Sequence, residues 1–115
     1  IAYLSCDVIK AMQEDSKTKI RSLTVDGGVS KNNFLMKFLS DIVDVHIERP
    51  KVVELTALGA CYMAGLAVGF WKDIDEIREN NAIDKCFDPD MDEEERNKKI
   101  SRWHEAVKYS MNWAK

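Results

Sequence analysis

The chain of 115 residues is 45% hydrophobic and 32% charged, which is the composition of a folded globular protein and excludes a disordered one. Its formal net charge of −3 excludes a general nucleic-acid binder, because such proteins carry a basic face that neutralises phosphates. No apolar run reaches the roughly 20 residues that a membrane-spanning helix needs, so we expect neither a nucleic-acid nor a membrane partner.

The three cysteines, Cys6, Cys61 and Cys86, are odd in number, lie far apart and form no Cys-x-x-Cys pair. Such spacing argues against a disulfide framework and against a zinc site, and we expect a reducing, cytoplasmic compartment. The sequence begins at Ile1 without an initiator methionine, inside an apolar helical pattern that has no capping residue before it. We therefore expect residues 1–115 to be a fragment of a longer protein.

The first part of the chain alternates between helical and extended patterns. Apolar residues at near-helical spacing predict an amphipathic helix from Ile1 to about Glu14. After a polar break, alternating apolar and polar residues predict a strand over residues 20–25. A second apolar stripe predicts a helix that ends at about Val43, and Ser30 is the residue expected to cap its start.

A second short strand is expected over Val45–Glu48, because Pro50 ends the pattern and cannot donate to a strand ladder. The helix predicted next, over residues 54–68, is rich in small residues that let it lie close to a sheet or to another helix. Gly59 inside that helix costs about 1 kcal/mol relative to alanine, which suits tight packing of the helix on the sheet. The alternative is that a backbone segment or a ligand approaches the helix there.

The last part of the chain is more polar. Asp73 is expected to cap a short helix that ends near Glu79, and residues 80–89 are expected to form a loop with at most one pair of strand residues. Acidic residues from Asp92 onward begin a final long helix, where the helix dipole favours them. One face of that helix carries Ile100, Trp103, Val107, Met111 and Trp113.

The order of these elements alternates helix and strand, which predicts an α/β layered architecture. Only two strands are clear, and two strands rarely form an independent sheet. We therefore expect the remaining strands of the sheet to lie in polypeptide that precedes Ile1.

Gly27 and Gly28 stand between the first strand and the helix after it, a common arrangement for binding an anion or a nucleotide. Glycine adopts positive φ and lets a ligand lie against the backbone, and the helix that follows offers free N–H groups. The alternative is a plain strand–turn–helix connection, because Asp-Gly is ordinary turn chemistry. Asp26 at the strand end is expected to cap the amides of this turn, although carboxylates at strand ends also act in catalysis.

Other chemistry is weakly represented. His46 and His104 have no partners at ligand spacing, so we expect them to be surface or packing residues. The acidic run from Asp92 to Glu95 is interpreted as a solvated helix start, and no P-loop, Gly-x-Ser-x-Gly or Cys–His pattern occurs. The residues alone therefore predict an α/β fragment that contacts a nucleotide.

Several stretches together resemble one protein family. They are Val25-Asp26-Gly27-Gly28, Asn32-Asn33-Phe34-Leu35-Met36, Ser40-Asp41-Ile42, Glu48-Arg49-Pro50 and the whole run from Glu54 to Asp73. Met91 to Arg96 and Trp103 also fit, so that the resemblance covers nearly all 115 residues. On these motifs the chain resembles the C-terminal domain of the glycerol kinases, which are members of the FGGY family of carbohydrate kinases.

The resemblance implies an α/β fold of the actin/hexokinase-like ATPase type, which is ribonuclease H-like, with ATP in the cleft between two domains. Residues 1–115 would form part of the C-terminal ATP-binding domain, and the N-terminal domain, absent from this sequence, would be its partner. The resemblance also implies transfer of the γ-phosphate of ATP to glycerol with Mg²⁺, which gives glycerol 3-phosphate. Such an enzyme would be cytoplasmic and, at full length, a homo-oligomer.

By motif position, the resemblance implies that Gly28 approaches the nucleotide, that Asn32 contacts its adenine side and that Gly27 is a backbone neighbour. The glycerol-binding residues and the catalytic aspartate of these kinases belong to their N-terminal part. No catalytic residue and no metal ligand is therefore assigned here, and the chain alone is expected to be inactive. The alternatives are the same portion of a kinase for another sugar or polyol, or a non-catalytic nucleotide-binding module.

Overall fold

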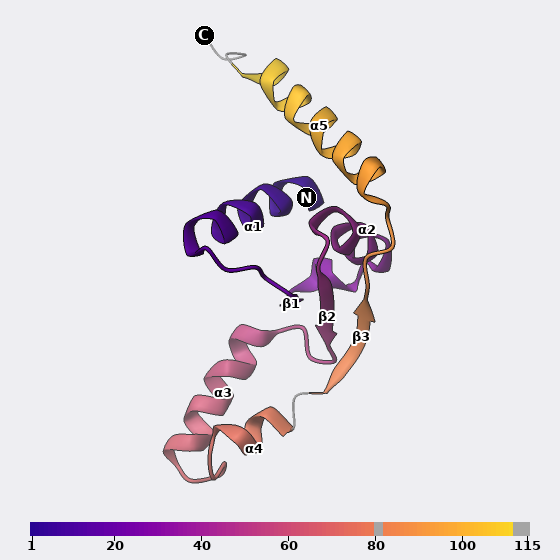
Figure 1. The fold of residues 1–115 in the computed structure, drawn as a ribbon. Helices are drawn as coiled ribbons and strands as arrows, with labels where there is room; N and C mark the ends of the chain where they lie inside the picture. Colours follow the sequence, from indigo (N-terminus) through magenta and orange to yellow (C-terminus); the bar gives the residue numbers. More distant parts are fainter. Residues whose placement is uncertain (80–81, 112–115) are drawn as a thin grey trace.

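The computed structural model describes residues 1–79 and 82–111 of the chain. Its helices and strands follow in the order α1 (Ala2–Ser16), β1 (Ser22–Thr24), the 3₁₀ helix η1 (Gly28–Lys31), α2 (Asn33–Val43), β2 (His46–Pro50), α3 (Leu55–Ala67), α4 (Ile74–Glu79), β3 (Ile83–Phe87) and α5 (Glu93–Ser110). Every helix and both strands predicted from the sequence are present (Figure 1). None of the helices in the described part is both long and apolar enough to cross a lipid bilayer.

A three-stranded sheet of order β1-β2-β3 lies at the centre of the molecule (Figure 1). β1 and β2 are parallel, with Leu23 opposite Ile47. β3 runs antiparallel to β2, with Phe87 opposite Ile47. Parallel strands need a crossover connection, and here η1 and α2 provide it between β1 and β2.

The third strand corrects a prediction made from the sequence. Residues 80–89 were expected to form a loop, but Ile83–Phe87 form β3, while residues 80–81 lie outside the described residues. Four of the five β3 side chains are exposed and only Phe87 is buried, so the strand lacks the alternation of a half-buried strand. Its pairing with β2, a long-range contact, makes it a strand.

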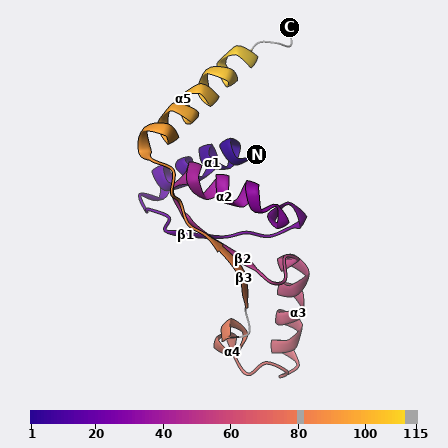
Figure 2. The ribbon, with the colours of Figure 1, turned by 90° about the vertical axis from the view of Figure 1, so that its right-hand side faces the viewer.

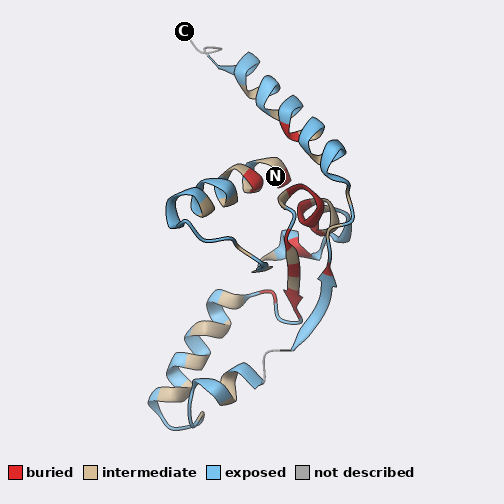
Figure 3. Cartoon of the chain, in the orientation of Figure 1, coloured by how far each residue is buried: buried red, intermediate tan, exposed pale blue. Residues whose placement is uncertain are grey.

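The hydrophobic core lies between α1, α2 and the sheet. Its main cluster consists of Ala2, Met36, Leu39, Ile47 and Phe87. A second cluster of Cys6, Ile42 and Ile100 joins α1, α2 and α5. The buried hydroxyl of Ser40 donates to the carbonyl oxygens of Val45 and Phe87 at 3.0 Å each, so α2 is also tied to the strands by hydrogen bonds. Figure 3 shows that buried positions concentrate in α2 and β2.

The chain is more extended than a compact domain of its length. Its radius of gyration is 17.7 Å, whereas a compact domain of similar length has about 13 Å. The pair α3 and α4 leaves at one end of the strands and α5 leaves at the other, as Figures 1 and 2 show from two sides. The chain therefore presents helix faces that no other described element covers.

The small residues of α3 predicted that this helix packs closely on the sheet, and for the described residues that prediction is wrong. α3 has no buried residue, and a Cβ added at Gly59 would meet no atom within 4 Å. Gly65 differs, because a Cβ there would lie 2.5 Å from Cδ1 of Trp71. The Trp71 ring also makes edge-to-face contacts with Tyr62 and Phe70. The helix therefore packs on the segment that follows it and not on the sheet.

The predicted cap at Asp73 is confirmed, and Asp92, which the sequence placed in the acidic start of the last helix, caps that helix in the same way. Asp73 accepts a hydrogen bond from the Glu76 N–H at 3.0 Å at the start of α4. Asp92 accepts one from the Glu95 N–H at 2.9 Å at the start of α5. Each carboxylate satisfies one of the N–H groups that a helix start leaves unpaired.

The inner face of α5 is confirmed over its first part. Ile100 is buried, and Trp103 and Val107 are half-buried. Met111 is 64% exposed, so its predicted place on this face is wrong, and Trp113 lies outside the described residues. The helix leaves the rest of the molecule before Met111, which explains the difference (Figure 1).

Candidate nucleotide-binding site

The loop after β1 begins with a glycine that the backbone requires. Gly27 has φ 76° and ψ 169°, a region that is essentially restricted to glycine. Its N–H donates to the carbonyl oxygen of Val53 at 2.7 Å, and its own carbonyl accepts from the N–H and the hydroxyl of Ser30 at 3.1 and 2.7 Å. Because both backbone groups of Gly27 are bonded, the strained conformation is held in place.

Gly28 is a different kind of glycine. It is exposed, its φ is not positive, and a Cβ at this position would meet no atom within 4 Å. As the first residue of η1, it has an N–H without an acceptor inside that helix, and no hydrogen bond between described residues uses it. Neither backbone strain nor packing among the described residues explains a glycine here. The position offers bare backbone and a free donor.

Asn32 lies at the other end of η1 and caps α2. Its Oδ1 accepts from the Leu35 N–H at 3.1 Å, which leaves its amide nitrogen available as a donor. The prediction that Ser30 caps this helix is wrong, because Ser30 is buried within η1 and its hydroxyl donates to Gly27. The 3₁₀ turn moves the start of α2 two residues along the chain. Of the predicted site residues, Gly28 begins this turn and Asn32 follows its last residue.

Arg49, to which the sequence assigned no role, connects the loop to the sheet. Its side chain is 10% exposed, and Nη1 donates to the Ser30 carbonyl at 3.0 Å and to Oδ1 of Asn33 at 2.9 Å. Nε and Nη2 lie 2.8 and 2.6 Å from Oδ2 of Asp84 on β3. These partners are 16 to 35 positions away in the sequence, so no local pattern signals the contact.

Asp26 is exposed, and none of the hydrogen bonds between described residues uses its carboxylate. The expectation that it caps the amides of the turn is therefore not met. A cavity of about 310 Å³ lies beside it. Asp26, Val29 and Ser30 border this cavity from the loop, and residues of α1, β1 and α2 close its other sides.

The two histidines pair with carboxylates, as expected of surface or packing residues. Nδ1 of His46 lies 2.5 Å from Oδ1 of Asp88, and this hydrogen bond raises the pKa of His46. Asp7 accepts from Nε1 of Trp103 at 2.7 Å and lies 2.9 Å from Nε2 of His104, and these contacts, Trp103 first, lower the pKa of Asp7. Within the described ranges, no group of three or more acidic, histidine or cysteine side chains is placed to hold a metal ion.

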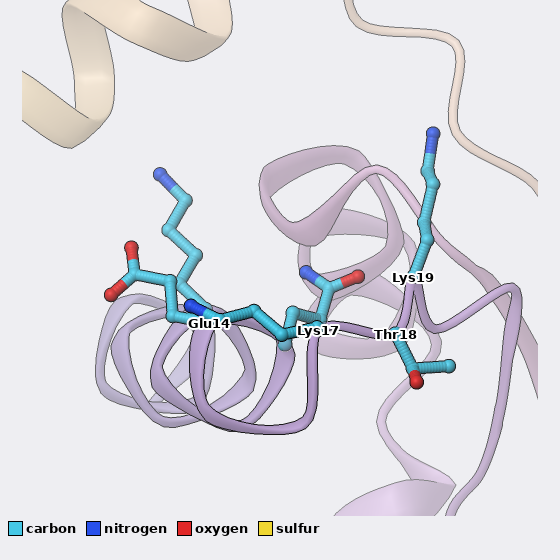
Figure 4. A pocket seen from close by; sticks show the side chains of 6 residues that line it. Glu14, Lys17, Thr18 and Lys19 are labelled. Atoms are coloured by element: carbon cyan, nitrogen blue, oxygen red, sulfur yellow. The ribbon is translucent and has the colours of Figure 1, made fainter.

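A groove of about 690 Å³ lies at the end of α1 (Figure 4). It is lined by Lys10, Gln13, Glu14, Lys17, Thr18 and Lys19. The groove shares no residue with the Gly27–Asn32 loop, and its walls are the polar side chains of one helix end and the turn after it. It therefore adds nothing to the candidate site.

Comparison with known proteins places the chain among the carbohydrate kinases. The model of the FGGY family of carbohydrate kinases, C-terminal domain, matches residues 1–68. Over all 115 residues the chain is 54% identical to a glycerol kinase of Haemophilus influenzae (strain PittEE) and 55% identical to glycerol kinase 1 of Clostridium tetani. It spans 23% of each of these relatives and matches their C-terminal part.

Solved structures agree with the sequence comparison. A crystal structure of Plasmodium falciparum glycerol kinase with ADP superposes with a TM-score of 0.86 at 33% identity, over 98% of this chain and 23% of that one. A ligand-bound xylulose kinase of Lactobacillus acidophilus matches with a TM-score of 0.65 at 22% identity, over 84% of this chain and 20% of its own. The second likeness concerns the fold alone. The α/β actin/hexokinase-like ATPase fold predicted from the sequence is confirmed.

Proposed function

The chain belongs to the FGGY family of carbohydrate kinases, and from this membership we propose that residues 1–115 are part of the C-terminal ATP-binding domain of a glycerol kinase. In the intact enzyme the γ-phosphate of ATP is transferred to glycerol with Mg²⁺ as the cofactor, and glycerol 3-phosphate is formed. The 54% identity to a curated glycerol kinase over the whole chain favours glycerol kinase among the carbohydrate kinases of the family.

Gly28 and Asn32 contact the nucleotide in this proposal, and Gly27 shapes the loop that presents them. Gly28 carries the argument, because neither its φ nor its surroundings require a glycine, whereas its bare Cα and free N–H suit a ligand that lies against the backbone. The amide nitrogen of Asn32 is available to donate, since only Oδ1 is used to cap α2. A solved glycerol kinase of the same fold was determined with ADP, which supports a nucleotide ligand.

The chain supplies the nucleotide side of the reaction and no catalytic residue. The glycerol-binding groups and the catalytic aspartate are assigned to the N-terminal domain, which is the partner of this chain. The extended shape and the uncovered face of α3 support further polypeptide packed against it. We expect the chain alone to be inactive. The intact enzyme is placed in the cytoplasm as a homo-oligomer, and the free thiols of Cys6, Cys61 and Cys86 fit a reducing compartment.

A kinase of the same family that acts on another sugar or polyol is the second candidate. The family model that matches residues 1–68 describes carbohydrate kinases in general and does not by itself specify the acceptor. The two candidates differ in the acceptor, and no acceptor contact is assigned to this chain. Phosphorylation of glycerol, of other polyols and of sugars by the intact enzyme distinguishes them, and we expect glycerol to give the highest kcat/KM.

The proposed site is tested by adding a single methyl group to the loop at Gly28. In the intact enzyme, we expect Gly28→Ala to raise the KM for ATP by about tenfold or more, which corresponds to about 1.4 kcal/mol of lost binding. The Tm should not fall, because the new Cβ meets no atom within 4 Å. Gly59→Ala is the matched control, since its Cβ is equally unobstructed but lies outside the loop. An unchanged KM for ATP in Gly28→Ala contradicts the proposed site.

A further inference from the structure

We propose that Arg49 is a positioning residue for nucleotide binding, which holds η1 and the start of α2 against the sheet so that Gly28 and Asn32 keep their places. This inference rests on the proposed function, because Gly28 and Asn32 are the groups that meet the nucleotide in it. Arg49 itself does not contact the nucleotide. It acts through the loop.

The guanidinium of Arg49 contacts residues on both sides of Asn32 in the sequence. Nη1 donates to the carbonyl oxygen of Ser30 at 3.0 Å and to Oδ1 of Asn33 at 2.9 Å. Ser30 lies in η1, and Asn33 is the first residue of α2. Among the described residues, these are the side-chain hydrogen bonds that reach η1 and the first turn of α2 from another element. Arg49 therefore holds the loop in place through one residue between Gly28 and Asn32 and through the residue directly after Asn32.

The guanidinium is itself held by the sheet. Its Nε and Nη2 lie 2.8 and 2.6 Å from Oδ2 of Asp84 on β3, and its carbon atom Cζ lies 5.5 Å from the centre of the Phe87 ring. Arg49 is paired with Lys85 in the antiparallel ladder, so its backbone is also part of the sheet. Because Asp84 and Phe87 hold the guanidinium and the ladder holds the Arg49 backbone, the contacts of Arg49 with Ser30 and Asn33 tie the loop to the sheet.

Only arginine fits this set of partners. Its planar guanidinium presents several donors in a fixed fork, so that one side chain bonds a carbonyl, an amide oxygen and a carboxylate at once. A lysine keeps the charge but has a single nitrogen, which cannot reach Asp84 and the two loop acceptors together. Arg49→Lys therefore preserves the buried charge and removes the connection between sheet and loop.

The test separates positioning from stability. In the intact enzyme, we expect Arg49→Lys to raise the KM for ATP by roughly tenfold, the smaller end of the loss seen when partners that orient a ligand-contacting group are removed. The KM for glycerol should stay unchanged, since no acceptor contact depends on this loop. Asp84→Asn should change the KM for ATP in the same direction by a smaller factor, because it weakens the anchor of the guanidinium without removing it. Its side chain is 46% exposed, so this variant is expected to fold.

Arg96→Lys is the matched control. Arg96 is similarly buried, with a side chain 13% exposed, and it donates to the carbonyl oxygens of Asp41 and Met91 and pairs with Asp44. These contacts fasten the opposite end of α2. We expect this variant to lower the Tm and to leave the KM for ATP unchanged.

The outcomes distinguish the inference from the proposed function. If Asn32→Ala raises the KM for ATP while Arg49→Lys and Asp84→Asn leave it unchanged, the positioning role is refuted and the nucleotide site stands. If Asn32→Ala and Gly28→Ala also leave it unchanged, the proposed site fails and the role of Arg49 fails with it. Should Arg49→Lys prove insoluble, an unchanged KM for ATP in Asp84→Asn is enough to overturn the inference. A higher KM for ATP in both variants, with the glycerol KM unchanged, supports it.

Discussion

The two adjacent glycines of the loop are expected to respond in opposite ways to alanine. Gly27→Ala should destabilise the folded protein by about 1 to 3 kcal/mol, the cost of a side chain in a sparsely populated backbone region. Gly28→Ala should leave stability unchanged or raise it by up to about 1 kcal/mol, because alanine restricts the unfolded chain more than glycine does. The prediction depends on the backbone and not on composition, since the two residues are neighbours of the same type.

The magnitude follows from the bonding of Gly27. Its φ of 76° and ψ of 169° are incompatible with an ordinary Cβ. Relaxation to a favourable φ would break the hydrogen bond from its N–H to Val53 or those from Ser30 to its carbonyl, each worth about 1 kcal/mol. The strain therefore persists in the folded state of the variant. For Gly28 no term of this kind exists, because its φ is not positive and its Cβ would meet nothing within 4 Å.

Thermal unfolding followed by circular dichroism measures both variants against the unmodified protein. A loss of 1 to 3 kcal/mol lowers Tm by about 4 to 12 °C in a chain of this size. Urea unfolding gives the free energies directly, and an unchanged m value shows that the unfolded states are comparable. Equal destabilisation by Gly27→Ala and Gly28→Ala would refute the distinction between a backbone-required glycine and a ligand-facing one.

Three further outcomes follow from the structure. In residues 1–115 alone, Gly59→Ala should stabilise α3 by about 0.5 to 1 kcal/mol in urea unfolding, because a Cβ there meets no atom of this chain within 4 Å; a loss of stability in residues 1–115 would contradict the open surroundings of Gly59. Ser40→Ala should cost about 1 to 3 kcal/mol in the same assay, since it leaves the carbonyl oxygens of Val45 and Phe87 without their buried donor, and a change near zero would contradict this. The folded-state pKa of Asp7 lies below its ordinary value of 3.8. The contribution of the Asp7 carboxylate to folding stability is therefore fully present above pH 3.8 and is lost as the pH falls through the folded-state pKa. Asp7→Asn should therefore be less stable than the unmodified protein at pH 6 and approach it at low pH, and a difference that does not change with pH would argue against a stabilising role of the charged Asp7 carboxylate in its contacts with Trp103 and His104.

Much of the helical framework follows from local sequence. The apolar spacing of α1 and α2 predicts both helices, and the acidic run from Asp92 to Glu95 predicts the start of α5. These features depend on residues within one or two turns of each other. In α1 the predicted apolar residues Leu4, Val8 and Met12 are nevertheless exposed, so the helix forms although no described element covers that side of it.

Features that depend on residues far apart in the chain could not be predicted from the local sequence. β3 has four exposed side chains and becomes a strand through its pairing with β2, far away in the sequence. The small residues of α3 suggested a sheet beneath them, but no described element covers that helix. Ser30 and Asn32 are both good helix caps, and only the 3₁₀ turn between them decides in favour of Asn32.

The organisation of the candidate site could not be predicted from the sequence, and its residues remain a prediction. The motif indicated Gly27, Gly28 and Asn32, and the structure shows that Gly27 has a positive φ whereas Gly28 does not. That difference requires a backbone angle and the surroundings of a Cβ, which a sequence does not contain. The connection from Arg49 to the loop joins residues from η1, α2, β2 and β3, so it exists only after the sheet has formed.

The most direct measurement is a crystal structure of the intact enzyme with bound ADP. The proposed function predicts that the Gly28 backbone lies against the nucleotide and that the Asn32 amide comes within about 3 Å of it, the length of an ordinary hydrogen bond. A nucleotide bound elsewhere, with the loop directed away from both its base and its phosphates, would contradict the central claim.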